Sequence, residues 1–344
     1  MVVAHRAMRD QVFRKTMSPS DAVTLYDAGA GQSQGGRKHQ EDRCALILPD
    51  RFPSNSQDKV AFFAVYDGHG SALVSEHVNN TMHHLLGRRP ELARDDWAGA
   101  IKAALAEEDR ILLDTFKYQS AEPAISGSTV AICCINLTKG ELVISNLGDT
   151  HVILAERDLQ TEHPYHIRRL TEAHKPGVPR EKSRIEQAGG AVINRNGTQR
   201  VGGLGMRLAL KIKYLLVGIG SLNISRALGD LQYKNPVNTF TDNPVPDPAS
   251  SAGSRPETRG DFLSNDPYTS RRTLRTDRRY LLLVVSDGVT DRVDDTTLVQ
   301  HVMKLSMRGK PASEIAQEIA TNSASRPHSD NATCIVAMLD GQGS

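Results

Sequence analysis

The chain has 344 residues, 39% of them hydrophobic and 24% charged, which is the composition of a globular protein that can bury a full core. Its 42 Lys and Arg nearly balance 40 Asp and Glu, and a net charge of +2 gives no reason to expect nucleic acid as a partner. No stretch reaches the roughly 20 apolar residues of a membrane-spanning helix, and the N-terminus has no secretory apolar region, so neither secretion nor a membrane is expected.

The first 20 residues are basic, with four Lys and Arg against a single acid, Asp10. This is the charge bias of a mitochondrial presequence, but the apolar residues do not gather on one face of a helical wheel. We therefore expect residues 1–20 to be a loose basic N-terminal extension. A cytoplasmic location is favoured, and the mitochondrial matrix is the alternative.

Residues 21–344 are predicted to form a single domain, because strand and helix patterns alternate and no period of 20 to 50 residues repeats. Seven short apolar or β-branched runs are predicted as strands: Cys44–Leu48, Val60–Tyr66, Thr129–Ile135, Glu141–Asn146, His151–Ala155, Tyr280–Ser286 and Ala332–Met338.

Three segments have the 3.6-residue spacing of helices. Their apolar stripes are Val74, Val78, Met82 and Leu85; Trp97, Ile101, Leu105, Leu112 and Phe116, after the caps Asp95 and Asp96; and Ile315 and Ile319, in a helix that begins at Pro311. Strands at hairpin distance, interleaved with helix pairs, favour antiparallel sheets covered by helices over a doubly wound parallel sheet. The predicted class is α/β of the α+β type.

Residues 240–279 read as a loop, because they hold five of the 16 prolines. Five arginines near the end of this stretch, Arg271, Arg272, Arg275, Arg278 and Arg279, predict a solvated basic loop. Docking of an acidic or phosphorylated partner is the alternative interpretation.

The four cysteines are Cys44, Cys133, Cys134 and Cys334, and they form no Cys-x-x-Cys pair. All lie in or beside apolar runs, so we expect reduced, buried thiols in an intracellular protein. The sequence also lacks a Cys-x5-Arg loop, which argues against catalysis by a cysteine nucleophile.

Acidic residues recur beside glycine at the ends of the predicted strands. The pairs and runs are Glu41-Asp42, Asp67-Gly68-His69-Gly70, Gly148-Asp149, Gly229-Asp230, Asp287-Gly288 and Asp330-Asn331. A turn explains any one Asp-Gly pair, but it does not explain so many together. Converging carboxylates with few His and no Cys suit Mg²⁺ or Mn²⁺ rather than structural zinc.

Two such ions about 4 Å apart can hold a bridging water as hydroxide and stabilise a displacement at phosphorus, which makes phosphate-ester hydrolysis the natural chemistry. Arg37 is a candidate for binding the phosphoryl oxygens, because guanidinium binds phosphate with two hydrogen bonds. His69, beside Asp67, is a candidate general acid for the leaving oxygen.

The ordered motifs resemble those of the metal-dependent serine/threonine protein phosphatases of the 2C type, in particular fungal members. The resemblance runs from about Gln34 to Met338. Its motifs are Arg37-Lys38-His39-Gln40-Glu41-Asp42, Val65-Tyr66-Asp67-Gly68-His69-Gly70, Ser126-Gly127-Ser128-Thr129, Asn146-Leu147-Gly148-Asp149, His174-Lys175-Pro176, Glu181 with Arg184-Ile185 and Gly189-Gly190, Ser225-Arg226-Ala227-Leu228-Gly229-Asp230, Ser286-Asp287-Gly288 and Asp330-Asn331.

The resemblance implies a four-layer sandwich of two antiparallel β-sheets flanked by helix pairs, with a two-metal site at one end. By the motif matches, Asp67 would bridge two Mg²⁺ or Mn²⁺ ions, the Gly68 carbonyl would bind one, and Asp287 and Asp330 would complete the other. The resemblance also implies that Glu41 and Asp42 hold metal-bound water, that Asp149 helps to bind a weaker third metal, and that Asn331 supports Asp330. Arg37 would bind the substrate phosphate, and His69 would protonate the leaving oxygen.

The chain departs from the family pattern at Ala173, where aspartate is usual, and at Thr290, where tryptophan is commonest. A larger departure is the atypical insertion at residues 205–222, whose removal restores an uninterrupted RVGGLNISRALGD. One hypothesis is a translated intron or another gene-model artefact. The alternative is a real edge strand, because apolar and other residues alternate from Met206 to Tyr214.

The predicted function is hydrolysis of phosphoserine and phosphothreonine in proteins by the metal-bridging hydroxide, without a covalent intermediate. The alternative is a phosphatase-fold binding module whose catalysis the insertion impairs, although the retained metal ligands argue against it. A metal-dependent nuclease would need a basic track with interleaved aromatic residues, which the sequence lacks. We expect a phosphoprotein substrate, no nucleic acid, no membrane and, by default, a monomer.

Overall fold

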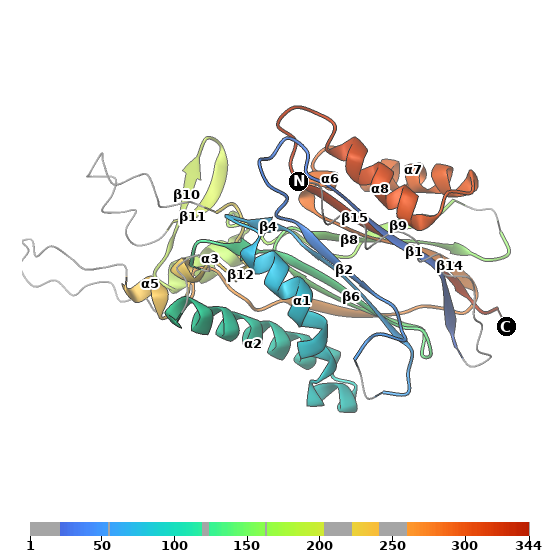
Figure 1. Cartoon of the computed structure of the whole chain (residues 1–344), viewed down its shortest axis with the longest axis horizontal. Helices are drawn as coiled ribbons and strands as arrows, with labels where there is room; N and C mark the ends of the chain where they lie inside the picture. The colour runs from blue at the N-terminus through green and yellow to red at the C-terminus, as the bar shows by residue number, and fades with distance from the viewer. Residues whose placement is uncertain are drawn as a thin grey trace, which may run out of the picture.

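The computed structural model describes residues 21–53, 56–118, 124–161, 164–202, 222–240 and 260–343. Two antiparallel β-sheets pack face to face, with helices α1 and α2 on one outer side and α7 and α8 on the other (Figure 1). The predicted four-layer sandwich is therefore confirmed. The extension at residues 1–20 and all of the insertion except Leu222 lie outside the described residues.

Each large sheet has five strands, and every neighbouring pair is antiparallel. In spatial order, the first sheet consists of β1 (Val23–Ser33), β15 (Ala332–Gly341), β14 (Arg278–Val285), β8 (His151–Asp158) and β9 (His166–Arg169). The second consists of β13 (Tyr268–Thr273), β7 (Glu141–Leu147), β6 (Val130–Asn136), β3 (Val60–Tyr66) and β2 (Arg43–Ile47). All seven predicted strands are confirmed, with ends shifted by up to three residues.

Strand β3 shows why its sequence is apolar at every position. Ala61, Phe63 and Val65 point into the core between the two sheets. Phe62 and Tyr66 point the other way, into the core beneath α1 and α2. Both faces of the strand are covered, so all seven residues are buried and polar alternation is lost.

The predicted helices are confirmed as α1 (Leu73–Gly87), α2 (Trp97–Tyr118) and α8 (Ala312–Ser323). Of the two predicted caps, Asp96 accepts a hydrogen bond from the Gly99 backbone N–H at 2.9 Å, whereas Asp95 ends the preceding short helix (Pro90–Arg94). Helix α7 (Asp295–Met307) was not predicted. It packs with α8 on the first sheet, around Leu298, Val302 and Ile315.

Shorter elements gather at the end of the sandwich where the predicted motifs converge (Figure 1). Strands β4 (Gly68–His69), β5 (Gly127–Ser128) and β12 (Leu228–Gly229) form a small antiparallel sheet with β5 in the middle. Helix α3 (Pro179–Gln187), the hairpin β10 (Ala191–Arg195) and β11 (Thr198–Gly202), the short helices α5 (Val237–Phe240) and α6 (Asp287–Thr290) and a turn of helix at Leu231–Tyr233 complete the chain.

The solvated basic loop predicted within residues 240–279 is wrong for its arginine-rich end. Residues Tyr268–Thr273 form β13, which pairs with β7 at the edge of the second sheet. Arg271 bonds to Asp95 at 2.6 Å and also to Glu141, and Arg279 pairs with Asp340 at 2.7 Å. The side chains of an edge strand alternate in exposure, so polar residues are compatible with it. Residues 241–259 lie outside the described residues.

All four cysteines are free and buried, as predicted. Burial raises the pKa of the Cys44 thiol to about 12, so this thiol is not a reactive nucleophile near neutral pH. None of the helices in the described part of the chain has both the length and the apolar character needed to cross a membrane.

Candidate metal centre

Three carboxylates converge where strands of both sheets end. Asp67 follows β3, Asp149 lies between β7 and β8, and Asp287 follows β14 and begins α6. One oxygen from each carboxylate lies within 4.8 Å of an oxygen from each of the others. We call these three residues the acidic group. Two rigid sheets position its members, so their oxygens are held close without a flexible loop between them.

The electrostatics of the acidic group are those of uncompensated like charges. Burial and the neighbouring Asp149 and Asp291 raise the pKa of Asp287 to about 8. Burial, together with Asp42 and Asp287, raises the pKa of Asp67 well above its ordinary value. Oxygen-only donors whose charges repel each other fit a hard divalent cation, because the cation neutralises them and satisfies their lone pairs.

Lys175 is a cation that reaches the acidic group. The ammonium of Lys175 bonds to Asp149, and its charge opposes the rise in the pKa of Asp287. The sequence motif contained Lys175, but no role was predicted for it. A single half-exposed lysine cannot compensate three ionised carboxylates, so Asp67 and Asp287 ionise together only at a cost that their raised pKa values record.

Arg37 and Asp330 form an ion pair beside the acidic group. The distance from Arg37 Nη2 to Asp330 Oδ2 is 2.5 Å, and both side chains are partly exposed. Asp330 is not one of the three carboxylates of the acidic group, but its charge contributes to the raised pKa of Asp67 and Asp287. Its role as a metal ligand stays a prediction.

Asp42 ties the loop before β2 to the first sheet. Its Oδ2 accepts hydrogen bonds from Ser286 Oγ at 2.9 Å and Thr333 Oγ1 at 2.7 Å. Burial nevertheless raises the pKa of Asp42 to about 6. Its charge is among those that raise the pKa of Asp67, which places it against the acidic group.

Asn331 fastens the loop that carries Arg37 and Glu41. Its Oδ1 accepts the Glu41 backbone N–H at 2.8 Å, and its Nδ2 donates to the carbonyls of Gln34 and His39. The backbone N–H of Asn331 also donates to Asp330 Oδ1 at 2.8 Å. One amide side chain therefore fixes the loop relative to Asp330.

Gly68 and His69 form β4 directly after Asp67. A Cβ at Gly68 would lie 2.3 Å from the Glu41 carbonyl oxygen, so only glycine allows this close approach of the Glu41 loop. The Nε2 of His69 lies 2.6 Å from Oδ2 of Asp230. Burial lowers the pKa of His69, but the Asp230 carboxylate outweighs it and the net shift is upward.

A second charged cluster surrounds Glu181 of α3. The Glu181 carboxylate accepts hydrogen bonds from Arg226 Nη2 at 2.5 Å and from Ser225 Oγ at 2.8 Å, and it pairs with Arg184. Burial opposes ionisation, yet Arg226 prevails and lowers the pKa of Glu181 to about 2. We call Glu181, Arg184, Ser225 and Arg226 the Glu181 cluster.

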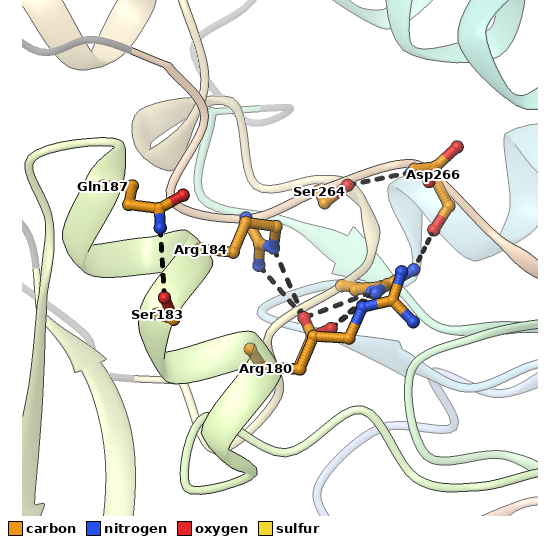
Figure 2. A pocket seen from close by; sticks show the side chains of 8 residues that line it. Arg180, Ser183, Arg184, Gln187, Ser264 and Asp266 are labelled. Carbon is orange, nitrogen blue, oxygen red and sulfur yellow. Dashed lines mark hydrogen bonds and ion pairs between the residues drawn. The ribbon is translucent and has the colours of Figure 1, made fainter.

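Three members of the Glu181 cluster, Glu181, Arg184 and Arg226, line a pocket of about 370 Å³ (Figure 2). Ser225 joins the cluster to the acidic group through His174. The Ser225 backbone N–H donates to the His174 carbonyl at 3.0 Å, and His174 Nδ1 accepts the Gly148 backbone N–H at 3.0 Å. Burial lowers the pKa of His174 to about 4, which keeps Nδ1 free to accept. Gly148 directly precedes Asp149, so the cluster supports that carboxylate through the backbone.

Comparisons with known proteins agree with this architecture. The family model described as protein phosphatase 2C matches residues 26–332. Protein phosphatase 2C homolog 3 of Schizosaccharomyces pombe is 26% identical over 333 residues, covering 95% of this chain and 67% of the relative. Protein spalten of Dictyostelium discoideum is 28% identical over 323 residues, covering 91% of this chain.

The chain spans only 28% of protein spalten and 51% of probable protein phosphatase 2C 14 of Arabidopsis thaliana, so the first of these relatives are mostly longer. Among solved structures, serine-threonine phosphatase 2C from Toxoplasma gondii superposes with a TM-score of 0.71 at 22% identity, covering 95% of this chain and 98% of that one. The family match extends from β1 to β15 and includes every member of the acidic group. The chain therefore belongs to the protein phosphatase 2C family.

Proposed function

We propose that residues 21–344 form a single phosphatase domain that removes phosphate from phosphoserine and phosphothreonine in proteins, with Mg²⁺ or Mn²⁺ as cofactor. The observation that carries this proposal is the acidic group, in which Asp67, Asp149 and Asp287 offer only oxygen ligands and repel one another. Membership of the protein phosphatase 2C family supports the substrate class. We propose a monomer as the working state.

The residues that would hold two ions are Asp67, the Gly68 carbonyl, Asp287 and Asp330, with Glu41 and Asp42 acting through water and Asp149 available to a third, weaker ion. When bound, such ions supply an activated water as nucleophile and neutralise charge on the phosphoryl group, so that no covalent intermediate is needed. Asp330 would take this role after Arg37 exchanges its carboxylate for a substrate phosphate.

Arg37 and His69 would act on the substrate. The partly exposed guanidinium of Arg37 can bind two phosphoryl oxygens and hold the ester in line for attack. His69 can give a proton to the leaving serine or threonine oxygen. Asn331 would keep Arg37 and Glu41 in register with Asp330, because it holds the loop that carries them.

The test is hydrolysis of a phosphothreonine peptide while Mn²⁺ is titrated from zero. We expect metal-dependent turnover by the full chain and its loss in Asp287→Asn. Metal-dependent turnover that survives in Asp287→Asn, or turnover in the presence of a chelator, would contradict the proposal.

The same assay on a chain lacking residues 205–222 tests the insertion. Turnover by both chains identifies a tolerated loop, and turnover only after the deletion locates an inhibitory element in it. If both chains are folded and inactive, the binding-module alternative replaces the enzyme. Sequencing of the transcript across the segment decides separately between an artefact and a real insertion.

A further inference from the structure

His69 and Asp230 form a hydrogen-bonded pair in which only His69 has a role in the proposed function. Their side chains meet with Nε2 of His69 at 2.6 Å from Oδ2 of Asp230. The Asp230 side chain is 1% exposed and the His69 side chain is 25% exposed. The ring is therefore the member of the pair that a substrate can reach, and the carboxylate lies behind it.

The small sheet of β4, β5 and β12 builds this pair. His69 and Gly229 both face Gly127 of the central strand, and Asp230 directly follows Gly229. A Cβ at Gly127 would lie 2.0 Å from Asp230 Oδ2 and 2.5 Å from His69 Nε2. The hydrogen bond crosses over β5 at the one position where the absence of a side chain lets it pass.

Stability does not account for the buried carboxylate of Asp230. Its Oδ1 has no hydrogen-bond partner, and no Lys or Arg pairs with it in the described part of the chain. By comparison, the nearby buried carboxylate of Asp109 accepts hydrogen bonds from Lys234, Asn265 and the Gly229 backbone N–H. A buried carboxylate with a single partner costs several kcal/mol of desolvation, which makes Asp230 a poor contributor to stability and a candidate for a role in the site.

The backbone does not require an aspartate at position 230 either. Asp230 has a left-handed backbone with a φ of 48°. Asparagine tolerates this conformation as readily as aspartate does. The feature that only aspartate supplies here is the negative charge against His69.

We propose that Asp230 is a positioning residue for His69 in phosphate-ester hydrolysis, an inference that rests on the function proposed above. An ionised carboxylate only accepts hydrogen bonds, so Nε2 carries the hydrogen and Nδ1 is left for the substrate. The oxygen of water bonds to phosphorus as the bond from phosphorus to the serine or threonine oxygen breaks. The electron pair of the broken bond stays on the serine or threonine oxygen, which takes the proton that the imidazolium form of His69 carries on Nδ1. His69 becomes neutral, the products are the alcohol and phosphate, and Asp230 gains no proton.

Two substrates whose leaving groups differ in their need for a proton distinguish this positioning role from a structural one. Asp230→Asn keeps the size and the turn, and we expect it to lower kcat on a phosphothreonine peptide about 100-fold while KM changes less than about threefold. On p-nitrophenyl phosphate, whose phenolate leaves without a proton, kcat should fall less than about threefold. Gly127→Ala should show the same selective loss, because its Cβ separates the pair without removing either member.

Asp114→Asn is the matched control, since Asp114 is an exposed partner of Arg110 on α2. It should leave both substrates unaffected. Equal losses on both substrates in Asp230→Asn, or no selective loss with the peptide, would overturn the proposal. Circular dichroism and the thermal midpoint check that each variant is folded.

A measurement on the metal-free protein keeps this proposal separate from the proposed function. Long-range ¹H–¹⁵N NMR at alkaline pH reports which nitrogen of the His69 ring carries the hydrogen. We expect Nε2–H in the wild-type and Asp114→Asn proteins and loss of that preference in Asp230→Asn. If the wild type hydrolyses neither substrate, the proposed function fails, but this spectrum still tests whether Asp230 orients His69. A wild-type ring with its hydrogen on Nδ1 would overturn that role of Asp230.

Discussion

The acidic group and the Glu181 cluster are two buried sets of charge that are linked through His174 and built in opposite ways. In the acidic group, three carboxylates share one lysine, and the pKa of Asp287 rises to about 8 through burial and the neighbouring acids. In the Glu181 cluster, one carboxylate has two guanidinium groups and a hydroxyl, and its pKa falls to about 2.

This difference suits the acidic group to binding a cation and the Glu181 cluster to supporting the structure around it. A cluster that neutralises its own charge is complete, so its contribution is to hold α3 against the loop that precedes Asp149. A cluster that leaves buried carboxylates repelling one another lowers the stability of the empty protein, and it becomes favourable when a cation enters. The opposite shifts of pKa in the two clusters thus favour the acidic group as the one that binds a ligand.

The largest expected effect is that of Asp287→Asn. Activity should fall at least about 1,000-fold, because a metal ligand is lost, while the free energy of unfolding in chelator should rise by about 1–3 kcal/mol as repulsion is relieved. Peptide hydrolysis and urea denaturation in EDTA measure the two effects. If the metal-free variant is less stable than the wild type, the acidic group is not strained by its own charges.

Glu181→Gln should have the opposite effect on stability and lower the free energy of unfolding. The substitution leaves the buried guanidinium of Arg226 beside a neutral amide, and breaking a buried ion pair in this way costs about 3–5 kcal/mol of unfolding free energy. Denaturation by urea checks the loss, which should be the same with and without Mn²⁺. Glu107→Gln on the exposed face of α2 is the control and should leave the urea midpoint close to that of the wild type. Retention of full stability in Glu181→Gln would show that the cluster does not hold α3.

The two clusters should also respond to pH in different windows and with opposite signs. The folded pKa of Asp287, about 8, exceeds its ordinary value of 3.8, so the metal-free protein should lose stability as the pH rises from about 4 to 8. The folded pKa of Glu181, about 2, is below its ordinary 4.5, so its contribution is present above pH 4.5 and is lost as the pH falls toward 2.

Thermal midpoints across this pH range, with EDTA or with saturating Mn²⁺, measure both effects. The decline between pH 4 and 8 should disappear in Mn²⁺, because the ion replaces the protons that the carboxylates would otherwise bind. The decline below pH 4.5 should remain in both conditions and should be reduced in Glu181→Gln. A decline above pH 4 that persists unchanged in Mn²⁺ would contradict the assignment of the acidic group as the cation site.

The sequence could predict the members of the acidic group because each follows an apolar or β-branched run. Strand β3 runs directly into Asp67, and β14 ends two residues before Asp287. Burial on both faces makes such strands continuous apolar segments, which are easily recognised. The pairing of Asp330 with Arg37 could not be predicted, since it depends on side-chain conformations in two loops.

Strand β1 was missed for a physical reason. Its pattern is interrupted by Gly29 and Gly31, which read as loop residues in the sequence. A Cβ at Gly29 would lie 2.1 Å from the backbone nitrogen of Ser313, and one at Gly31 would lie 2.3 Å from that of Gln317. These glycines mark the close packing of α8 on the strand, and that packing is invisible until the two segments are placed together.

The partner of His69 was unpredictable for a related reason. The pair depends on the register of three strands of two residues each, and such short strands leave no periodic pattern. Helix α7, in contrast, could have been found. Leu298, Val302 and Leu305 have helical spacing, and Asp294 caps the helix by accepting the Thr297 backbone N–H.

The smallest expected effect comes from Lys175, which pairs with Asp149 of the acidic group. The side chain is 40% exposed, so Lys175→Met should lower the stability of the metal-free protein by less than about 1 kcal/mol, and added salt should remove the difference. The same substitution should strengthen Mn²⁺ binding about three- to tenfold, because the ammonium no longer competes for Asp149 or repels the incoming ion.

Isothermal titration with Mn²⁺ measures this change in affinity, and Lys182→Met on α3 is the matched control, since its ammonium pairs with Glu186 at 3.9 Å. Weaker Mn²⁺ binding in Lys175→Met would mean that the lysine holds Asp149 in its binding geometry rather than competing with the ion. Lys175 would then resemble Arg226, a cation that completes a carboxylate. Stronger Mn²⁺ binding would instead mean that the Lys175 ammonium pairs with Asp149 only in the metal-free protein and is displaced when the ion binds.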